Sequence, residues 1–123
     1  MHEIKWEKSL NKEHVKASSD FLTLLFEKKE VERMAQKLEK HKKDLQKFKA
    51  KDILRASNTQ LLPETNEDVR NEFRKIVRGE KLFPVALVRC AGRLLIADGY
   101  HRTCAAYYLN KDMEVHCILV GDE

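Results

Sequence analysis

Hydrophobic positions in the first part of the chain recur at the spacing of helices. Between residues 12 and 29 they lie three or four apart, which predicts a helix with Asn11 as its N-terminal cap. A narrower apolar stripe of Val31, Met34, Ala35 and Leu38 predicts a second helix over residues 29–43. A hairpin of two such helices buries little apolar surface alone, so we expect it to pack on the rest of the chain.

From about residue 45 the pattern changes to short strands and shorter helices. The segment "LQKFK" alternates as a strand does, and "KDILRAS" predicts one or two helical turns. A loop around Pro63 precedes a helix over "NEDVRNEFRKIV". For that helix, Thr65 followed by Asp68 resembles a cap, and Gly79 is a stop signal.

The C-terminal part predicts a hairpin, a helix and a final strand. "LFPVALVRC" and "RLLIA" are apolar strands joined by a tight turn at Ala91-Gly92. "YHRTCAAYYL" then predicts a helix, and "EVHCILV" a strand in which His116 faces solvent. The order of elements predicts an α+β fold with a small mixed β-sheet and packed helices. We divide it into an N-terminal helical extension, residues 1–44, and a domain over residues 45–123.

The composition is that of a globular chain, with 42% hydrophobic and 36% charged residues among 123. No apolar stretch approaches the roughly 20 residues that a membrane span needs. The N-terminus lacks the apolar core of a signal peptide, so we expect a cytoplasmic protein with no membrane partner. The three cysteines are widely spaced and odd in number, which argues against a disulfide framework and predicts small buried thiols.

The net charge of +4 falls entirely within the first fifty residues. Residues 37–51 alone hold seven lysines against Glu39 and Asp44. Such a cluster is consistent with a surface that binds nucleic acid or another protein. It is equally consistent with a solvated helix end, because lysines near a helix C-terminus suit the helix dipole.

The residues that carry the most chemistry gather after "RLLIA", in the sequence Asp98-Gly99-Tyr100-His101-Arg102. A helix that begins directly after a strand directs unpaired N–H groups and its positive dipole end to one place, which favours an anion. Gly99 permits a sharp turn, Arg102 can hold a phosphate oxygen, and His101 can donate to phosphate or move a proton. Asp98 could cap the helix, orient its neighbours or hold Mg²⁺. An ordinary helix cap explains the same residues equally well.

The larger pattern adds to this local one. The stretch "KFKAKDILRASN", the segment "LFPVALVRCAGRLLIADGYHRTCAAYYL" and the terminal "VHCILV" together resemble the ParB/sulfiredoxin-like superfamily. The likeness covers roughly residues 45–120 and leaves the N-terminal helices outside it. It implies a ParB/sulfiredoxin-like core with a nucleotide or phosphate site at the junction after "RLLIA".

The branches of this superfamily differ in the box at that junction. Sulfiredoxins carry a box like "GGCHR" with a reactive cysteine, and Tyr100 in that position excludes sulfiredoxin chemistry. Partition-type ParB proteins carry "GERR", which Gly99 and Arg102 match, and bind CTP. They also read DNA through a helix-turn-helix domain that the first fifty residues do not resemble. Free-serine kinases carry "DGHHR", the best match to residues 98–102. They imply a catalytic carboxylate between the first strand and the next helix, where Glu64 lies.

We therefore expect a protein that binds ATP, ADP, CTP or another phosphate ligand, with Mg²⁺, and that resembles a small-molecule phosphotransferase. Whether it transfers a phosphoryl group or only binds one stays open. The alternative is a non-enzymatic DNA-associated or protein-interaction module that uses residues 37–51. Catalytic candidates are Asp98, His101 and Glu64; the metal candidate is Asp98; the phosphate-binding candidates are Gly99, Tyr100, His101, Arg102 and Thr103.

Overall fold

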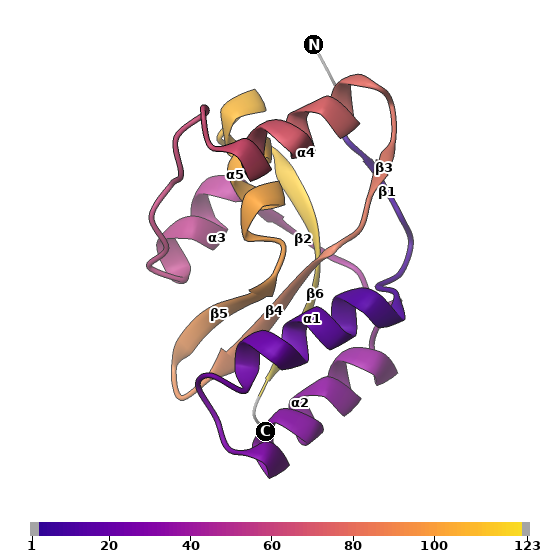
Figure 1. Cartoon of the computed structure of the whole chain (residues 1–123), viewed down its shortest axis with the longest axis vertical. Helices are drawn as coiled ribbons and strands as arrows, with labels where there is room; N and C mark the ends of the chain where they lie inside the picture. The colour runs from indigo at the N-terminus through magenta and orange to yellow at the C-terminus, as the bar shows by residue number, and fades with distance from the viewer. Residues whose placement is uncertain (1–2, 122–123) are drawn as a thin grey trace.

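A four-stranded mixed sheet forms the centre of the computed structural model, which describes residues 3–121 (Figure 1). This architecture confirms the α+β fold class predicted from the sequence. Along the chain the elements are β1 (Lys5–Trp6), α1 (Lys12–Leu22), α2 (Lys28–Lys40), β2 (Gln46–Lys49), α3 (Ala50–Ala56), α4 (Glu67–Val77), β3 (Lys81–Leu82), β4 (Val85–Cys90), β5 (Arg93–Asp98), α5 (Tyr100–Leu109) and β6 (Glu114–Gly121).

The strands of the central sheet lie in the order β2-β6-β4-β5. β6 runs parallel to β4 and antiparallel to β2, and β4 pairs antiparallel with β5 through the hairpin at Ala91-Gly92. Both turn residues have positive φ angles, 52° and 73°, as the central residues of a type I′ hairpin turn require. β5 is therefore an edge strand, and its last residue is Asp98.

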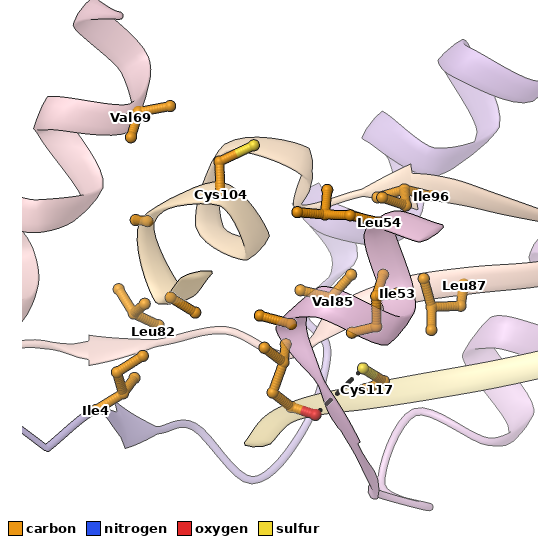
Figure 2. Close-up of a cluster of buried hydrophobic side chains, with 14 of the residues drawn as sticks. Ile4, Ile53, Leu54, Val69, Leu82, Val85, Leu87, Ile96, Cys104 and Cys117 are labelled. Atoms are coloured by element: carbon orange, nitrogen blue, oxygen red, sulfur yellow. Dashed lines mark hydrogen bonds between the residues drawn. The ribbon is translucent and has the colours of Figure 1, made fainter. Parts of the chain in front are cut away.

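Helices cover both faces of the sheet. β4 contains four buried apolar residues in succession, from Val85 to Val88, as expected where neither face of a strand meets water. Val85 and Leu87 belong to a core shared with α3, α4 and α5, part of which Figure 2 shows. Ala86 and Val88 belong to a second core, to which α1 and α2 contribute. The structure is thus a sheet between two helical layers.

The predicted N-terminal hairpin packs on the sheet with its apolar side. α1 contacts β5 and β4, whereas α2 contacts β6 (Figure 1). Of the predicted stripe on α2, Val31, Met34 and Leu38 are buried and Ala35 is half-buried. Both helices are short and amphipathic, and within residues 3–121 no helix combines the length and the apolar character needed to cross a membrane.

Two helix boundaries differ from those predicted. α1 ends at Leu22 rather than at residue 29, because tighter bonds, such as Leu25 N–H to Leu22 O, close the turn before α2. α4 is capped by Asn66 and not by Thr65. The Oδ1 atom of Asn66 accepts hydrogen bonds from the N–H groups two and three residues further on, which satisfies donors that no helical carbonyl can reach.

The strand β1 was not predicted from the sequence. It pairs in parallel with β3, so that Trp6 lies opposite Leu82, and the ring of Trp6 stacks on His116 with centroids 5.0 Å apart. His116 therefore faces solvent only in part, because Trp6 stacks on its ring and its Nδ1 atom is buried. Burial disfavours the imidazolium form and Lys47 adds positive charge nearby, so the pKa of His116 lies below its ordinary value of 6.5.

Candidate functional site

The junction between β5 and α5 turns through a single glycine. Gly99 is the N-terminal cap residue of α5 and has a φ angle of 107°, a conformation that residues with a side chain rarely adopt. A Cβ atom at this position would lie 2.8 Å from Cγ2 of Val85 and 3.0 Å from an amino nitrogen of Arg102. Glycine is therefore required both by the turn and by the side chains packed against it.

Arg102 lies under this turn rather than on the surface. Only 6% of the residue is exposed. Its NH1 group donates to the carbonyl oxygens of Phe83 at 2.7 Å and Pro84 at 3.2 Å, and its NH2 group donates to Oδ2 of Asp98 at 2.6 Å. Arg102 thus fixes the end of β5 to the chain that enters β4. The guanidinium group has five N–H donors, and a direct contact between Arg102 and phosphate stays a prediction.

A second side chain reaches Asp98 from the N-terminal extension. Nδ1 of His14, on α1, lies 2.7 Å from the same Oδ2 atom of Asp98. The His14 ring also packs against the ring of Phe83, with centroids 4.6 Å apart. The backbone holds it in place as well, because Asn11 Oδ1 accepts from the N–H of His14 at 2.9 Å and Ser18 Oγ donates to its carbonyl at 2.8 Å.

These contacts set the charge of Asp98, whose side chain is 19% exposed. Burial by itself raises the pKa of a carboxyl group, but the hydrogen bond from His14 and the charge of Arg102 outweigh that effect. The pKa of Asp98 therefore lies below its ordinary value of 3.8. Asp98 is a carboxylate at neutral pH and acts as the acceptor for both partners.

A cleft of about 450 Å³ opens over the junction. α1, α4, α5 and the segment around β3 all contribute to its wall, which carries acidic and basic side chains together. The lining residues are Glu13, His14, Glu72, Lys75, Glu80, Lys81, Leu82, Phe83, Asp98, Gly99, His101 and Arg102.

The N-terminus of α5 meets this cleft without a side-chain cap. Asn11 caps α1 and Asn66 caps α4, but within residues 3–121 no side-chain cap accepts a hydrogen bond from the first turn of α5, as is also the case for α2 and α3. Gly99 has no side chain to do so, and the carboxylate of Asp98 is bound to His14 and Arg102. The first N–H groups of a helix need an acceptor from outside it, and an anion bound there also meets the positive end of the helix dipole.

The other predicted site residues occupy three different surroundings. His101 lines the cleft with a side chain that is 40% exposed, and its Nε2 atom lies 3.6 Å from Oδ2 of Asp68. Tyr100 donates its hydroxyl proton to the carbonyl of Gln60, and the buried Thr103 donates to the carbonyl of Gly99 at 2.9 Å. Both hydroxyl groups therefore stabilise the junction from within the protein.

Glu64 is not part of this cleft. It is exposed and lines a separate groove with Phe73 and the arginines of α4, near Tyr108. For Glu64 to act in catalysis at this cleft, the loop before α4 would have to move toward Asp98. Its catalytic role therefore stays a prediction.

The residues around Asp98 do not form a cage for a metal ion. Within residues 3–121 there is no group of three or more histidine, cysteine or acidic side chains placed to hold one. Oδ2 of Asp98 already accepts hydrogen bonds from His14 and Arg102. Mg²⁺ binds proteins through one or two carboxylates together with substrate phosphates. Binding of Mg²⁺ at Asp98 therefore stays a prediction only for an ion that enters together with a nucleotide.

Several residues of the cleft were not found from the sequence. His14 lies in a segment that the sequence assigned to a separate extension, and no local pattern links it to Asp98. Glu72 and Lys75 lie on the helix that the sequence predicted before Gly79, but their direction depends on how α4 packs. Lys81 lies just before the predicted strand "LFPVALVRC". Among the described residues, Oε2 of Glu72 is buried and has no hydrogen-bond partner, so the cleft offers a ligand an acceptor as well as donors.

The lysine-rich segment, residues 37–51, lies on a different part of the molecule. It runs from the end of α2 through β2, which is the edge strand opposite β5. Some of its lysines are paired, Lys42 with Glu39 and Lys51 with Asp112. A second cleft of about 580 Å³ lies at its start, where Lys37, Lys40 and Arg89 meet the end of β6. Lysines beside an edge strand also discourage pairing with another chain.

Comparison with known proteins returns no match to a family model, to a curated protein or to a solved structure.

Proposed function

We propose that the protein binds a nucleotide or another phosphate ligand in the cleft over the β5–α5 junction. One observation carries the proposal: the first turn of a ten-residue helix, without a side-chain cap among the described residues, lies at a cleft that Gly99 also lines. Backbone N–H groups at a helix N-terminus bind phosphate in many unrelated folds, and glycine lets the ligand approach them closely.

The surrounding side chains support this ligand. Lys75 and Lys81 line the cleft and are exposed, so their ammonium groups can reach a phosphate oxygen. His101 lies in the first turn of α5, where its ring can donate to the same group. The buried pair of Asp98 and Arg102 holds the turn in shape, which spares the ligand the cost of ordering it.

We extend the proposal to the superfamily and to the chemistry. The order of strands and helices around the junction is the order expected of a ParB/sulfiredoxin-like core, which supports membership and a nucleotide as ligand. Phosphoryl transfer to a small molecule needs a group near the phosphate that accepts the proton of the attacking hydroxyl. Glu72 is the carboxylate of the cleft with an oxygen that no described residue binds. Asp98 serves as a positioning residue, because its carboxylate is bound to both His14 and Arg102.

Calorimetric titration tests the proposal with inorganic phosphate, ATP, ADP and CTP, each with and without Mg²⁺. We expect at least one of these ligands to bind, and Lys81→Gln together with Lys75→Gln to weaken that binding by roughly tenfold, as the loss of about 1.4 kcal/mol requires. Lys16→Gln is the matched control, because Lys16 is exposed on α1 and pairs only with Asp20. Absence of binding by all four ligands would overturn the proposal.

A second function has a specific observation in its favour. The cleft that Lys37, Lys40 and Arg89 line is basic and adjoins the lysine-rich segment, which suits a polyanion such as DNA. Anisotropy measurements with a DNA duplex at several salt concentrations test it. Binding that weakens with salt and is lost when Lys40, Lys42 and Lys43 become glutamine would support this second function, whereas salt-independent or absent binding would exclude it.

A further inference from the structure

Of the residues that line the junction cleft, His14 is the one whose position there is hardest to predict from the sequence. It lies on α1, 84 positions before Asp98, yet its ring lines the cleft beside Gly99 and Arg102. Its side chain is 25% exposed, which leaves part of the ring open to a ligand. The helix that carries it packs on β5, so the contact is part of how the N-terminal extension meets the sheet.

The partner of each ring nitrogen is set by this geometry. Asp98 is held as a carboxylate by Arg102, and a carboxylate can only accept, so Nδ1 of His14 is the donor in the 2.7 Å contact. Nε2, on the other side of the ring, is the nitrogen left for a group in the cleft. A carboxylate that binds one nitrogen of an imidazole in this way fixes the orientation of the other, as in many catalytic and metal-binding histidines.

We propose that His14 is a ligand-contacting residue of the junction cleft, with Nε2 bound to an oxygen of the phosphate that α5 holds. This inference rests on the proposed function. It makes the N-terminal extension part of the binding site, because α1 supplies a group that the domain over residues 45–123 does not contain.

An imidazole and a phosphate are well matched for such a contact. Both groups gain or lose a proton near neutral pH, the imidazole near 6.5 and a phosphate monoester near 6 in their ordinary states. One proton between Nε2 and a phosphate oxygen forms a hydrogen bond from either side: the imidazolium donates to the oxygen, or the P–OH group donates to the nitrogen. The number of protons is the same in both forms, so no further acid or base is needed.

Two substitutions separate the nitrogen that holds Asp98 from the nitrogen that meets the ligand. The amide nitrogen of asparagine falls near the position of an imidazole Nδ1, and that of glutamine falls near Nε2. His14→Asn therefore keeps the bond to Asp98 and removes the group in the cleft, whereas His14→Gln does the reverse. We expect His14→Asn to unfold like the unmodified protein in urea but to bind inorganic phosphate or ATP at least tenfold more weakly, the range for a charged hydrogen bond. We expect His14→Gln to be the less stable variant and the tighter binder of the two.

The matched control is His41→Asn. His41 makes the same contact, Nδ1 to an aspartate oxygen at 2.7 Å, with Asp44 outside the cleft, and its replacement leaves ligand affinity unchanged. A purely structural role for His14 predicts the opposite order, with affinity following stability, and that result would overturn the inference. Phosphate binding that is equal in the unmodified protein and in His14→Asn would also overturn it while leaving the proposed function intact. Failure of the unmodified protein to bind any ligand would instead remove the proposed function, and this inference with it.

A spectroscopic readout completes the test. The ¹⁵N resonance of His14 Nε2 moves strongly when that atom gains a hydrogen-bond partner. The Nδ1 atom is bound to Asp98 with and without ligand, so its resonance stays in place. We expect addition of phosphate to shift the Nε2 resonance and to leave the resonances of His41 in place. An unshifted Nε2 resonance at saturating ligand would overturn the inference.

Discussion

Oδ2 of Asp98 accepts a hydrogen bond from Nδ1 of His14 at 2.7 Å, and the two residues are 84 positions apart in the chain. The same oxygen accepts from Arg102 at 2.6 Å. One carboxylate thus joins the first long helix, the edge strand β5 and the first turn of α5. Replacing this carboxylate, protonating it and adding a side chain to the neighbouring Gly99 each have measurable consequences.

Asp98→Asn tests the contribution of this carboxylate to stability. The amide keeps the size of the side chain but removes the negative charge that His14 and Arg102 bind, and it brings two donor protons close to them. We expect the free energy of unfolding in urea to fall by about 1–3 kcal/mol, the usual range for a partly buried hydrogen bond to a charged group. Asp20→Asn removes an exposed pair with Lys16 and should change stability by less than about 0.5 kcal/mol. Equal effects of the two substitutions would contradict the assigned role of Asp98.

The stabilisation by Asp98 should disappear in acid. Its pKa is lowered in the folded protein, whereas an unfolded aspartate titrates near 3.9, so the unfolded chain takes up the proton first as the pH falls. The contribution is therefore complete well above pH 4 and is lost as the pH falls through the lower, folded pKa. The difference in unfolding free energy between the unmodified protein and Asp98→Asn should shrink between pH 5 and pH 2. A difference that stayed constant over this range would show that the carboxylate does not titrate as described.

Gly99→Ala tests whether the turn needs glycine for space as well as for its backbone angle. Gly92 provides the matched control, since it also has a positive φ, 73°, but a Cβ there meets no atom within 4 Å. Gly92→Ala should cost only the left-handed backbone strain, about 1–2 kcal/mol. Gly99→Ala adds contacts of 2.8 Å with Val85 and 3.0 Å with Arg102, so we expect a further loss of about 1–3 kcal/mol in thermal or urea unfolding. Similar losses for both variants would mean that Val85 and Arg102 move aside without cost.

Trp6 reports on His116 because it is the only tryptophan of the chain and stacks on that imidazole. A protonated imidazole stacked on an indole quenches its fluorescence, so the emission should fall as the pH falls. Burial, with Lys47 nearby, lowers the pKa of His116, and we expect the midpoint of the change below pH 6.5. His116→Asn should abolish the transition, and His41→Asn should leave it unchanged. A midpoint at or above pH 6.5 would refute the effect of burial.

The local elements of the fold could be predicted because their signals lie close together in sequence. Asn11 caps α1, the turn at Ala91-Gly92 joins β4 to β5, and the helix predicted over "YHRTCAAYYL" has the bounds of α5. The same nearness explains why the junction itself was found: Asp98, Gly99 and Arg102 lie within five residues.

The features that could not be predicted from the sequence depend on contacts between residues that lie far apart in the chain. β1 is two residues long and exists because β3 lies beside it, and His116 is covered because Trp6 arrives from the other end of the chain. The hydrogen bonds of Arg102 to the carbonyls of Phe83 and Pro84 could not be predicted either, since only the folded chain brings these groups together. His14 is the extreme case, because a single histidine in an amphipathic helix carries no sign of a carboxylate 84 residues away.

The packing of α1 on β5 also has a consequence for the order in which the protein matures. The helical hairpin leaves the ribosome before the strands it covers, and contacts between segments so far apart in the chain form slowly because a long loop must close first. Until β4, β5 and β6 are paired, Leu22, Met34 and Leu38 have no apolar surface to bury against. His14 can meet Asp98 only when that docking is complete, so occupancy of the cleft would signal that the chain has finished folding.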